Sequence, residues 1–149
     1  MVLQQLRSQW TVEGAAERAA EGSAEGASDT ADPEFAGRFA SWFDHESEQR
    51  TFWLAEGAGR PVGMLNLLVV RRMPRPGHVD RAWGYLGNLY VLPERRRQGV
   101  GTLLVDAALG EAMHRGLVRL VLHPNAGSLP FWRSRAFSET GDLWVRELP

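Results

Sequence analysis

The stretch that decides the fold reads Val-Leu-Pro-Glu-Arg-Arg-Arg-Gln-Gly-Val-Gly and runs from Val91 to Gly101. The apolar run before it, residues 83–92, predicts a strand, which Pro93 ends because proline cannot donate to a strand ladder. After it, apolar residues recur at helical spacing as far as Met113, and Gly116 supplies a C-terminal stop. A glycine-bearing loop with three consecutive arginines therefore lies between a buried strand and the start of a helix.

This loop has the properties of an anion-binding site. The first N–H groups of a helix have no internal partner, and the helix dipole is positive at that end. Gly99 and Gly101 lack a Cβ, so a ligand can approach the backbone, and Arg95, Arg96 and Arg97 attract negative charge. The pattern predicts a site for phosphate or pyrophosphate, although a tight turn with solvated arginines is the alternative. It lacks the Gly-Lys-Ser/Thr of a Walker loop, and the first glycine of a dinucleotide fingerprint would fall on Arg96.

Residues 96–101, Arg-Arg-Gln-Gly-Val-Gly, fit the pattern Q/R-x-x-G-x-G/A. In this the chain resembles the GNAT superfamily of N-acetyltransferases, whose pyrophosphate loop has that pattern. The lead-in at residues 88–94 is similar to the strand that precedes the loop in the family. The resemblance covers roughly residues 33–148. It implies an α/β (α+β) fold, in which a mixed central sheet with splayed parallel strands is flanked by helices. It also implies acetyl-CoA as co-substrate and no metal.

Composition favours one globular domain over residues 1–149. The apolar content of 44% and the charged content of 23% are ordinary for a soluble protein. No apolar run approaches the roughly 20 residues of a membrane span. The sequence contains no cysteine and begins without a secretory signal pattern, so the expectation is a cytoplasmic protein without disulfides. We expect neither nucleic acid nor membrane as a partner.

Charge is distributed unevenly along the chain. All 17 basic residues are arginine. Residues 1–70 contain 11 acidic and 5 basic residues, whereas residues 71–149 contain 7 acidic and 12 basic ones. A basic half suits a polyanionic cofactor and an acidic half suits a cationic amine, but a mixed solvated surface explains the same numbers.

The N-terminal third is expected to be helical in part. Residues 3–10 are expected to form the tail of a helix, and residues 13–32, rich in Ala, Gly and Glu, either a frayed helix or a mobile loop. Asp32 is then expected to cap a helix with Pro33 at its first position, reaching about Gln49. Its aromatic stripe is expected in the core: Phe35, Phe39, Trp42 and Phe43. Its exposed end is a second candidate for meeting substrate: His45, Glu46 and Glu48.

The later elements follow from apolar patterns and turn residues. Strands are expected at residues 50–56, 62–71, 83–92 and 117–123. The strands at 83–92 and 117–123 are expected to be parallel, because a helical crossover connects them. A short helix is expected over residues 125–135 with Ser128 as its N-cap, then a terminal hairpin of residues 137–140 and 143–148. The strand that usually opens the family has no counterpart, so it is missing, replaced by residues 1–3, or trimmed.

The resemblance also assigns cofactor contacts. Backbone pairing with the pantetheine arm falls on Leu89, Tyr90 and Val91, and pyrophosphate binding falls on Arg96, Arg97, Gln98, Gly99, Val100, Gly101 and Thr102. Asn125 is placed either to bond the pantetheine chain or to cap the next helix. Trp132 occupies the position of a family tyrosine and is expected near the cofactor.

Two departures from the family pattern leave the catalytic residue unassigned. The family's Tyr-x-x-x-Gly-Phe reads Trp-Arg-Ser-Arg-Ala-Phe over residues 132–137. An indole cannot deliver a proton at useful acidity, and Ala136 disfavours a positive φ. The glutamate that many relatives carry before the loop has no equivalent in residues 86–88. His123 is a candidate base, and ordered water with good positioning is the alternative.

The sequence therefore predicts an acetyl-CoA-dependent N-acetyltransferase in which an amine attacks the thioester directly. A strand amide near Leu89 or Val91 is expected to stabilise the oxyanion. The acceptor stays open among small amines, antibiotics, peptide N-termini and protein lysines. A non-catalytic acyl-CoA-binding or sensing module is the alternative, because the tyrosine and glutamate are missing. A nucleotide-binding protein of another fold is a third. We expect a homodimer, formed through a sheet edge or the terminal hairpin with Trp144 and Val145.

Overall fold

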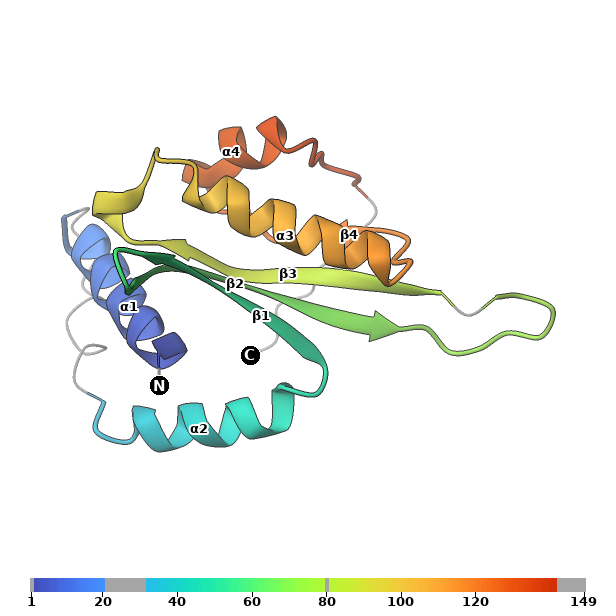
Figure 1. Cartoon of the computed structure of the whole chain (residues 1–149), viewed down its shortest axis with the longest axis horizontal. Helices are drawn as coiled ribbons and strands as arrows, with labels where there is room; N and C mark the ends of the chain where they lie inside the picture. Colours follow the sequence, from blue (N-terminus) through green and yellow to red (C-terminus); the bar gives the residue numbers. More distant parts are fainter. Residues whose placement is uncertain (1, 21–31, 80, 142–149) are drawn as a thin grey trace.

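A mixed sheet forms the centre of the computed structural model, which describes residues 2–20, 32–79 and 81–141 (Figure 1). Its strands are β1 (Arg50–Gly57), β2 (Arg60–Arg71), β3 (Ala82–Val91) and β4 (Leu120–Val121), in the order β1-β2-β3-β4. The first three are antiparallel neighbours, and β3 and β4 are parallel. The mixed sheet and the parallel pair confirm the expected fold class.

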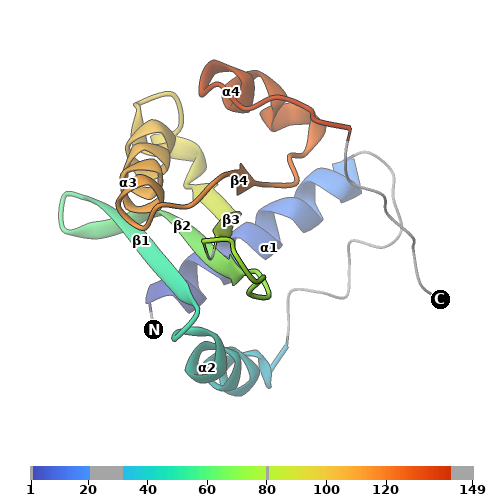
Figure 2. The ribbon, with the colours of Figure 1, turned by 90° about the vertical axis from the view of Figure 1, so that its right-hand side faces the viewer.

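Helices cover both faces of this sheet. On one face lie α1 (Val2–Ala20) and α2 (Phe35–Glu46), and on the other α3 (Val100–His114) and α4 (Leu129–Ser134) (Figures 1 and 2). Two 3-10 turns, η2 (Pro93–Arg95) and η3 (Ala126–Ser128), precede α3 and α4. The β2–β3 hairpin runs on past the helices, so that its connecting loop projects from the body of the molecule (Figure 1).

Alternation along β2 divides the core into two clusters. Leu65 and Leu67 pack with α3 residues such as Val105, whereas Met64 packs with Leu6 of α1. Successive side chains of a strand point to opposite faces, so one strand serves both layers. The first helix is therefore part of the core.

The pairing of β3 with β4 is brief. Only Gly84↔Leu120 and Tyr85↔Val121 are paired, although the sequence predicts a longer strand over residues 117–123. Gly84 permits the close approach, because a Cβ there would lie 2.5 Å from Leu67 Cδ1 and 2.6 Å from Leu120 Cδ2. Beyond this point β3 and the segment that follows β4 are no longer paired, which gives the splayed parallel strands that the family resemblance implies.

The N-terminal elements differ from the expectation. α1 spans 19 residues, so positions 13–20 continue the helix predicted for 3–10, and residues 21–31 lie outside the described part. Residues 2 and 3 belong to α1, so they do not replace the family's opening strand. α2 begins at Phe35, with Glu34 as its N-cap, and ends at Glu46. Asp32 accepts from the Glu34 amide and lies two residues before the N-cap, so it does not cap the helix.

The aromatic stripe of α2 is only partly in the core. No residue of α2 is buried, and Phe35, Phe39 and Trp42 line a cavity between this helix and the sheet. The prediction that the stripe lies in the core is right only in part. Phe39 and Phe43 are half-buried and pack against the cluster of α1 and β2, whereas Phe35 and Trp42 border the cavity.

Two C-terminal details are corrected as well. Ser128 is the N-cap of α4, as predicted, but its side chain makes no capping hydrogen bond; instead Asn125 Oδ1 accepts from the Ser128 amide at 2.8 Å. Ala136 has φ +61° despite its Cβ, because its amide donates to Arg133 and the Phe137 amide to Trp132, closing the end of α4. Residues 137–141 form no strand, and the second half of the predicted hairpin lies outside the described residues.

Candidate active site

A cavity of about 720 Å³ opens between the sheet and the two N-terminal helices. Its walls come from α1, α2 and all three long strands, and from the segment that follows β4. Residues 85–89 of β3 and residues 122–125 both line it, so the cavity includes the place where β3 and β4 part.

The strand at this place carries a bulge. The register between β2 and β3 shifts between Met64 and Asn66, and Asn88 takes a left-handed conformation with φ +57°. A bulge leaves a residue without a ladder partner. It therefore gives the backbone near Leu89 the means to donate an N–H to a bound group instead of to the next strand.

The predicted anion loop has the backbone of a nest. Arg97 and Gly99 have φ +60° and +83°, and Gly99 is the N-cap of α3. Alternating left-handed residues before a helix turn successive N–H groups toward one point. No heavy atom lies within 4 Å of a Cβ built on Gly99, and one built on Gly101 meets only ordinary contacts, the nearest at 3.5 Å from Phe131. The loop therefore fits a pyrophosphate.

Two side chains of the loop are held by the protein itself. Arg96 Nε donates to the Val91 carbonyl at 3.0 Å, and its Nη2 pairs with Glu13 Oε1 of α1 at 2.5 Å. Gln98 Nε2 donates to the Glu94 carbonyl at 2.9 Å. These contacts brace the loop and engage the side chains of Arg96 and Gln98 within the protein.

Tyr90 points toward α1. Its side chain is only 4% exposed, its ring stacks on Trp10 with centroids 5.6 Å apart, and its hydroxyl donates to Glu13 Oε2 at 3.0 Å. Burial, then the hydrogen bond and charge of Glu13, raise the pKa of Tyr90 to about 12. The ring thus fastens α1 to β3, and only the backbone of this residue is available on the strand for a ligand.

Three of the twelve sequence-predicted cofactor residues line the cavity: Leu89, Asn125 and Trp132. The other nine lie along β3 and around the start of α3. Asn125 caps η3, which was one of its two predicted roles. Trp132 is 7% exposed and packs edge-to-face on Phe131 and Phe137, with centroids 5.2 Å apart in both pairs. It is a core residue whose edge reaches the cavity.

The candidate base, His123, lines the cavity directly after β4, and Tyr85 lines it from β3. The three residues at the exposed end of α2 do not line it. His45 Nδ1 lies 2.6 Å from the Ser41 carbonyl oxygen, and Glu46 pairs with Arg50. In the described part of the chain, no aspartate or glutamate lines the cavity.

Sequence reasoning missed several residues that shape this cavity. Asn66, 3% exposed, is the one buried polar residue found in the described core and accepts from Arg50 Nη1 at 3.1 Å. A single asparagine within the apolar run of residues 62–70 was an available signal. Arg7 and Trp10 of α1 also line the cavity, and nothing in their local sequence indicates it.

Within the described ranges, no group of three or more side chains of the metal-ligating types lies together. No described helix is both long enough and apolar enough to cross a membrane.

Comparison with known proteins agrees with this geometry. The model of the acetyltransferase (GNAT) family matches residues 13–137. N-acetyltransferase family 8 member 3 of Rattus norvegicus is 31% identical over 101 residues, which are 66% of this chain and 42% of that protein. The match therefore spans less than half the length of this curated relative.

Solved structures show the same fold. A predicted acetyltransferase from Clostridium acetobutylicum, crystallised with acetyl-CoA, has a TM-score of 0.67 at 19% identity, covering 94% of this chain and 88% of that one. A GCN5-related N-acetyltransferase from Ralstonia eutropha has a TM-score of 0.64 at 24% identity, covering 94% and 92%.

Proposed function

This chain belongs to the acetyltransferase (GNAT) family, and on that premise we propose that it is an N-acetyltransferase that uses acetyl-CoA. The acetyl group passes to a primary amine of a small molecule, a peptide or a protein. The observation that carries the proposal is the parting of β3 and β4 after Tyr85 and Val121, next to the Asn88 bulge and open to a cavity.

The chain would hold acetyl-CoA with backbone groups. The amides at the start of α3 and the open space before Gly99 suit the pyrophosphate, and the strand backbone of residues 89–91 suits the pantetheine arm. When bound, acetyl-CoA supplies an acetyl thioester. The splay directs that group into the cavity, where an acceptor amine has room to approach.

The reacting groups then have defined partners. A strand amide near Leu89 stabilises negative charge on the thioester oxygen while the C–N bond forms and the C–S bond breaks. The sulfur leaves as a thiolate. The proton of the amine passes to His123, which lines the cavity, or to water.

A turnover assay tests this function. Purified protein, acetyl-CoA and a panel of amines are mixed, and free CoA thiol is measured with a thiol reagent. We expect amine-dependent release of CoA. Binding of acetyl-CoA by calorimetry without turnover of any amine would instead favour the acyl-CoA-binding or sensing module, which the tryptophan at position 132 also favours. No binding of acetyl-CoA would contradict both.

We also propose that the protein is a homodimer. β1 is an edge strand of the sheet, and its Leu54 is 41% exposed. Edge strands with apolar side chains are sites of association. Light scattering at tens of micromolar should give twice the mass of one chain, and the mass of a single chain would contradict the proposal.

A further inference from the structure

The acceptor side of the cavity has an unusual set of charges. Its charged lining consists of arginines, Arg7 from α1, Arg38 from α2 and Arg50 from β1, and no described carboxylate lines it. A site for a polycationic amine would need carboxylates at these places, because like charges repel in a partly desolvated cavity. The lining instead suits an acceptor that brings its own negative charge.

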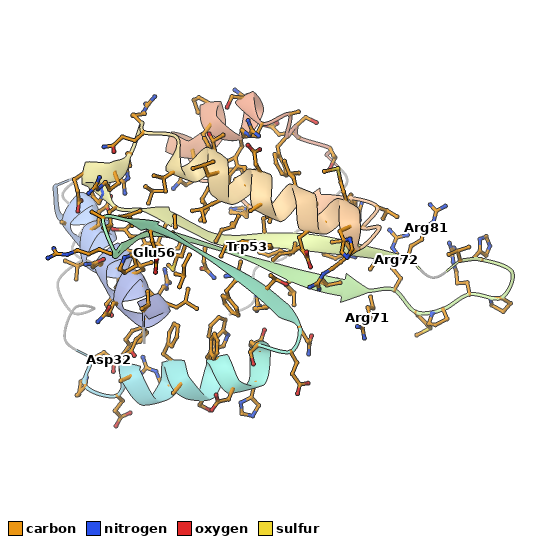
Figure 3. All side chains as sticks on the ribbon, viewed as in Figure 1. Asp32, Trp53, Glu56, Arg71, Arg72 and Arg81 are labelled. Carbon is orange, nitrogen blue, oxygen red and sulfur yellow. The ribbon has the colours of Figure 1, made fainter. Side chains whose placement is uncertain are left out.

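Two of the three arginines are already partnered. Arg38 pairs with Asp32, which lies just before α2 (Figure 3). Arg50 pairs with Glu46 at 2.7 Å and bonds Asn66. Both arginines therefore already have a carboxylate partner, which leaves Arg7 as the third cation of the lining.

Arg7, from α1, is the arginine of the lining that remains without a carboxylate partner among the described side chains. Its guanidinium carbon lies 4.7 Å from the centre of the Trp10 ring, and among the side chains that the structure describes no carboxylate lies within ion-pair distance of it. Partial burial lowers the pKa of Arg7, yet an arginine remains charged at neutral pH. A planar guanidinium held on an aromatic face at the edge of a cavity is suited to bidentate binding of a carboxylate.

The rest of the acceptor side is aromatic. Phe35, Phe39 and Trp42 come from α2, and Phe52 comes from β1. Neighbouring rings are in contact, with centroids 5.5 Å apart for Phe39 and Trp42 and 6.0 Å for Trp42 and Phe52. None of these rings is fully buried, so they present flat apolar surface to an occupant.

On the premise of the proposed N-acetyltransferase function, we propose that the acceptor is a primary amine carrying a carboxylate beside an aromatic or apolar body. Arg7 binds the carboxylate, and the rings of α2 pack on the body. Aromatic α-amino acids are the simplest compounds with this chemistry, and they serve as the probes.

Matched amines test the carboxylate directly. The values of kcat/KM are measured for L-tryptophan and tryptamine, and for L-phenylalanine and phenethylamine, with spermidine as a polycation. The variants are Arg7→Gln and Arg7→Lys. The control is Arg71→Gln, on the projecting hairpin away from the cavity (Figure 3). Comparing ratios between variants cancels the different basicities of the amino acids and the decarboxylated amines.

We expect the tryptophan-to-tryptamine ratio to fall at least about tenfold in Arg7→Gln, because a charge-assisted contact is lost. Arg7→Lys should retain part of the ratio, and Arg71→Gln all of it. An unchanged ratio in Arg7→Gln, or spermidine as the best acceptor of the unaltered protein, would overturn the inference while leaving the acetyltransferase function intact.

Calorimetry separates this inference from the function on which it rests. Binding of L-tryptophan and tryptamine is measured in the presence of CoA, without turnover. Tighter binding of tryptophan that depends on Arg7 supports the carboxylate site even if no amine is acetylated. Absence of tryptophan binding, or binding that Arg7→Gln leaves unchanged, overturns it.

Discussion

Glu13 Oε1 lies 2.5 Å from Arg96 Nη2, so the first helix of the chain is tied to the loop that precedes α3. The same carboxylate accepts the hydroxyl of Tyr90 at 3.0 Å. The partly buried carboxylate of Glu13 therefore holds α1 against β3, and it also offsets part of the positive charge of the proposed phosphate loop.

Glu13→Gln should make acetyl-CoA bind about two- to fivefold more tightly at low ionic strength, because Arg96 no longer faces a competing anion and a partly exposed charge pair is worth up to about 1 kcal/mol. The gain should disappear at 0.5 M NaCl, a concentration that screens exposed charges. Calorimetry at both salt concentrations measures it. Glu56→Gln, at the β1–β2 turn (Figure 3), is the control and should bind as the unaltered protein does. Weaker binding by the Glu13 variant would mean that Glu13 positions Arg96 for the ligand.

Gly101→Asp should abolish measurable acetyl-CoA binding and leave the protein folded. A Cβ at this position meets only ordinary contacts, and an acid in the first turn of α3 favours the helix while repelling a phosphate. Gly99 is a poorer choice, since its φ of +83° would strain any side chain. The matched control is Gly110→Asp, in the same helix with open space around it, which should bind normally. Retained binding in the Gly101 variant would exclude the loop as the pyrophosphate site.

Ala136→Gly should stabilise the protein by about 1 kcal/mol. The alanine is held at φ +61°, where a Cβ costs roughly 1–2 kcal/mol, and the greater freedom of glycine in the unfolded chain offsets part of the gain. Ala107→Gly, at an exposed position inside α3, should have the opposite sign and destabilise by about 0.5–1 kcal/mol. Urea denaturation of both variants gives the two free energies. Destabilisation by both would show that the turn after α4 does not impose the positive φ.

Tyr90→Phe should change how stability depends on pH. The neutral phenol is favoured in the folded protein, where its pKa is about 12, against 10.0 as the ordinary value. This contribution is complete below pH 10 and is lost as the pH rises toward 12, a decrease of roughly 2–3 kcal/mol. The phenylalanine variant lacks that decrease, although it loses a hydrogen bond worth about 1 kcal/mol at neutral pH. Denaturant titrations should therefore show the unaltered protein as the more stable of the two at pH 8 and the less stable at pH 11.5, and parallel losses would argue against a buried, Glu13-bonded phenol.

Trp132→Phe should keep more than about a tenth of the acetyltransferase activity. The indole packs against Phe131 and Phe137, and the substitution removes part of that packing, worth roughly 1 kcal/mol. A CoA thiolate can leave near neutral pH without a side-chain acid, so no tyrosine-like pKa should limit the rate at high pH. Steady-state rates from pH 6 to 10 provide the measurement. A thousandfold loss with normal acetyl-CoA binding would give the indole a catalytic role.

The parts of the fold that could be predicted are those whose signals are local. The strand–loop–helix unit around residues 91–101 has proline, glycine and helical periodicity in consecutive positions, and the structure has β3, η2 and α3 there. The full length of α1 could not be predicted, because its Ala- and Glu-rich second half has little to bury. Contacts with β3 fix its position, and no local pattern encodes them.

The cavity was less predictable than the loop for the same reason. Arg7 and Trp10 gain their place only when α1 packs on the sheet, and a periodic aromatic stripe such as that of α2 reads as core whether or not a partner fills the space. Ala136 shows the converse case. Its intrinsic preference argues against a positive φ, yet two backbone hydrogen bonds at the end of α4 impose one.

The contact of α1 with β3 has a consequence for the order of events during protein synthesis. Glu13 leaves the ribosome 77 residues before Tyr90 and 83 residues before Arg96. At about 5–20 residues per second, the helix waits roughly 4–17 s for its partners. During that time Leu3 and Leu6 lack Tyr90 of β3, one of the buried members of their cluster. The apolar face of α1 is therefore completely covered only after β3 has emerged, late in the synthesis of the domain.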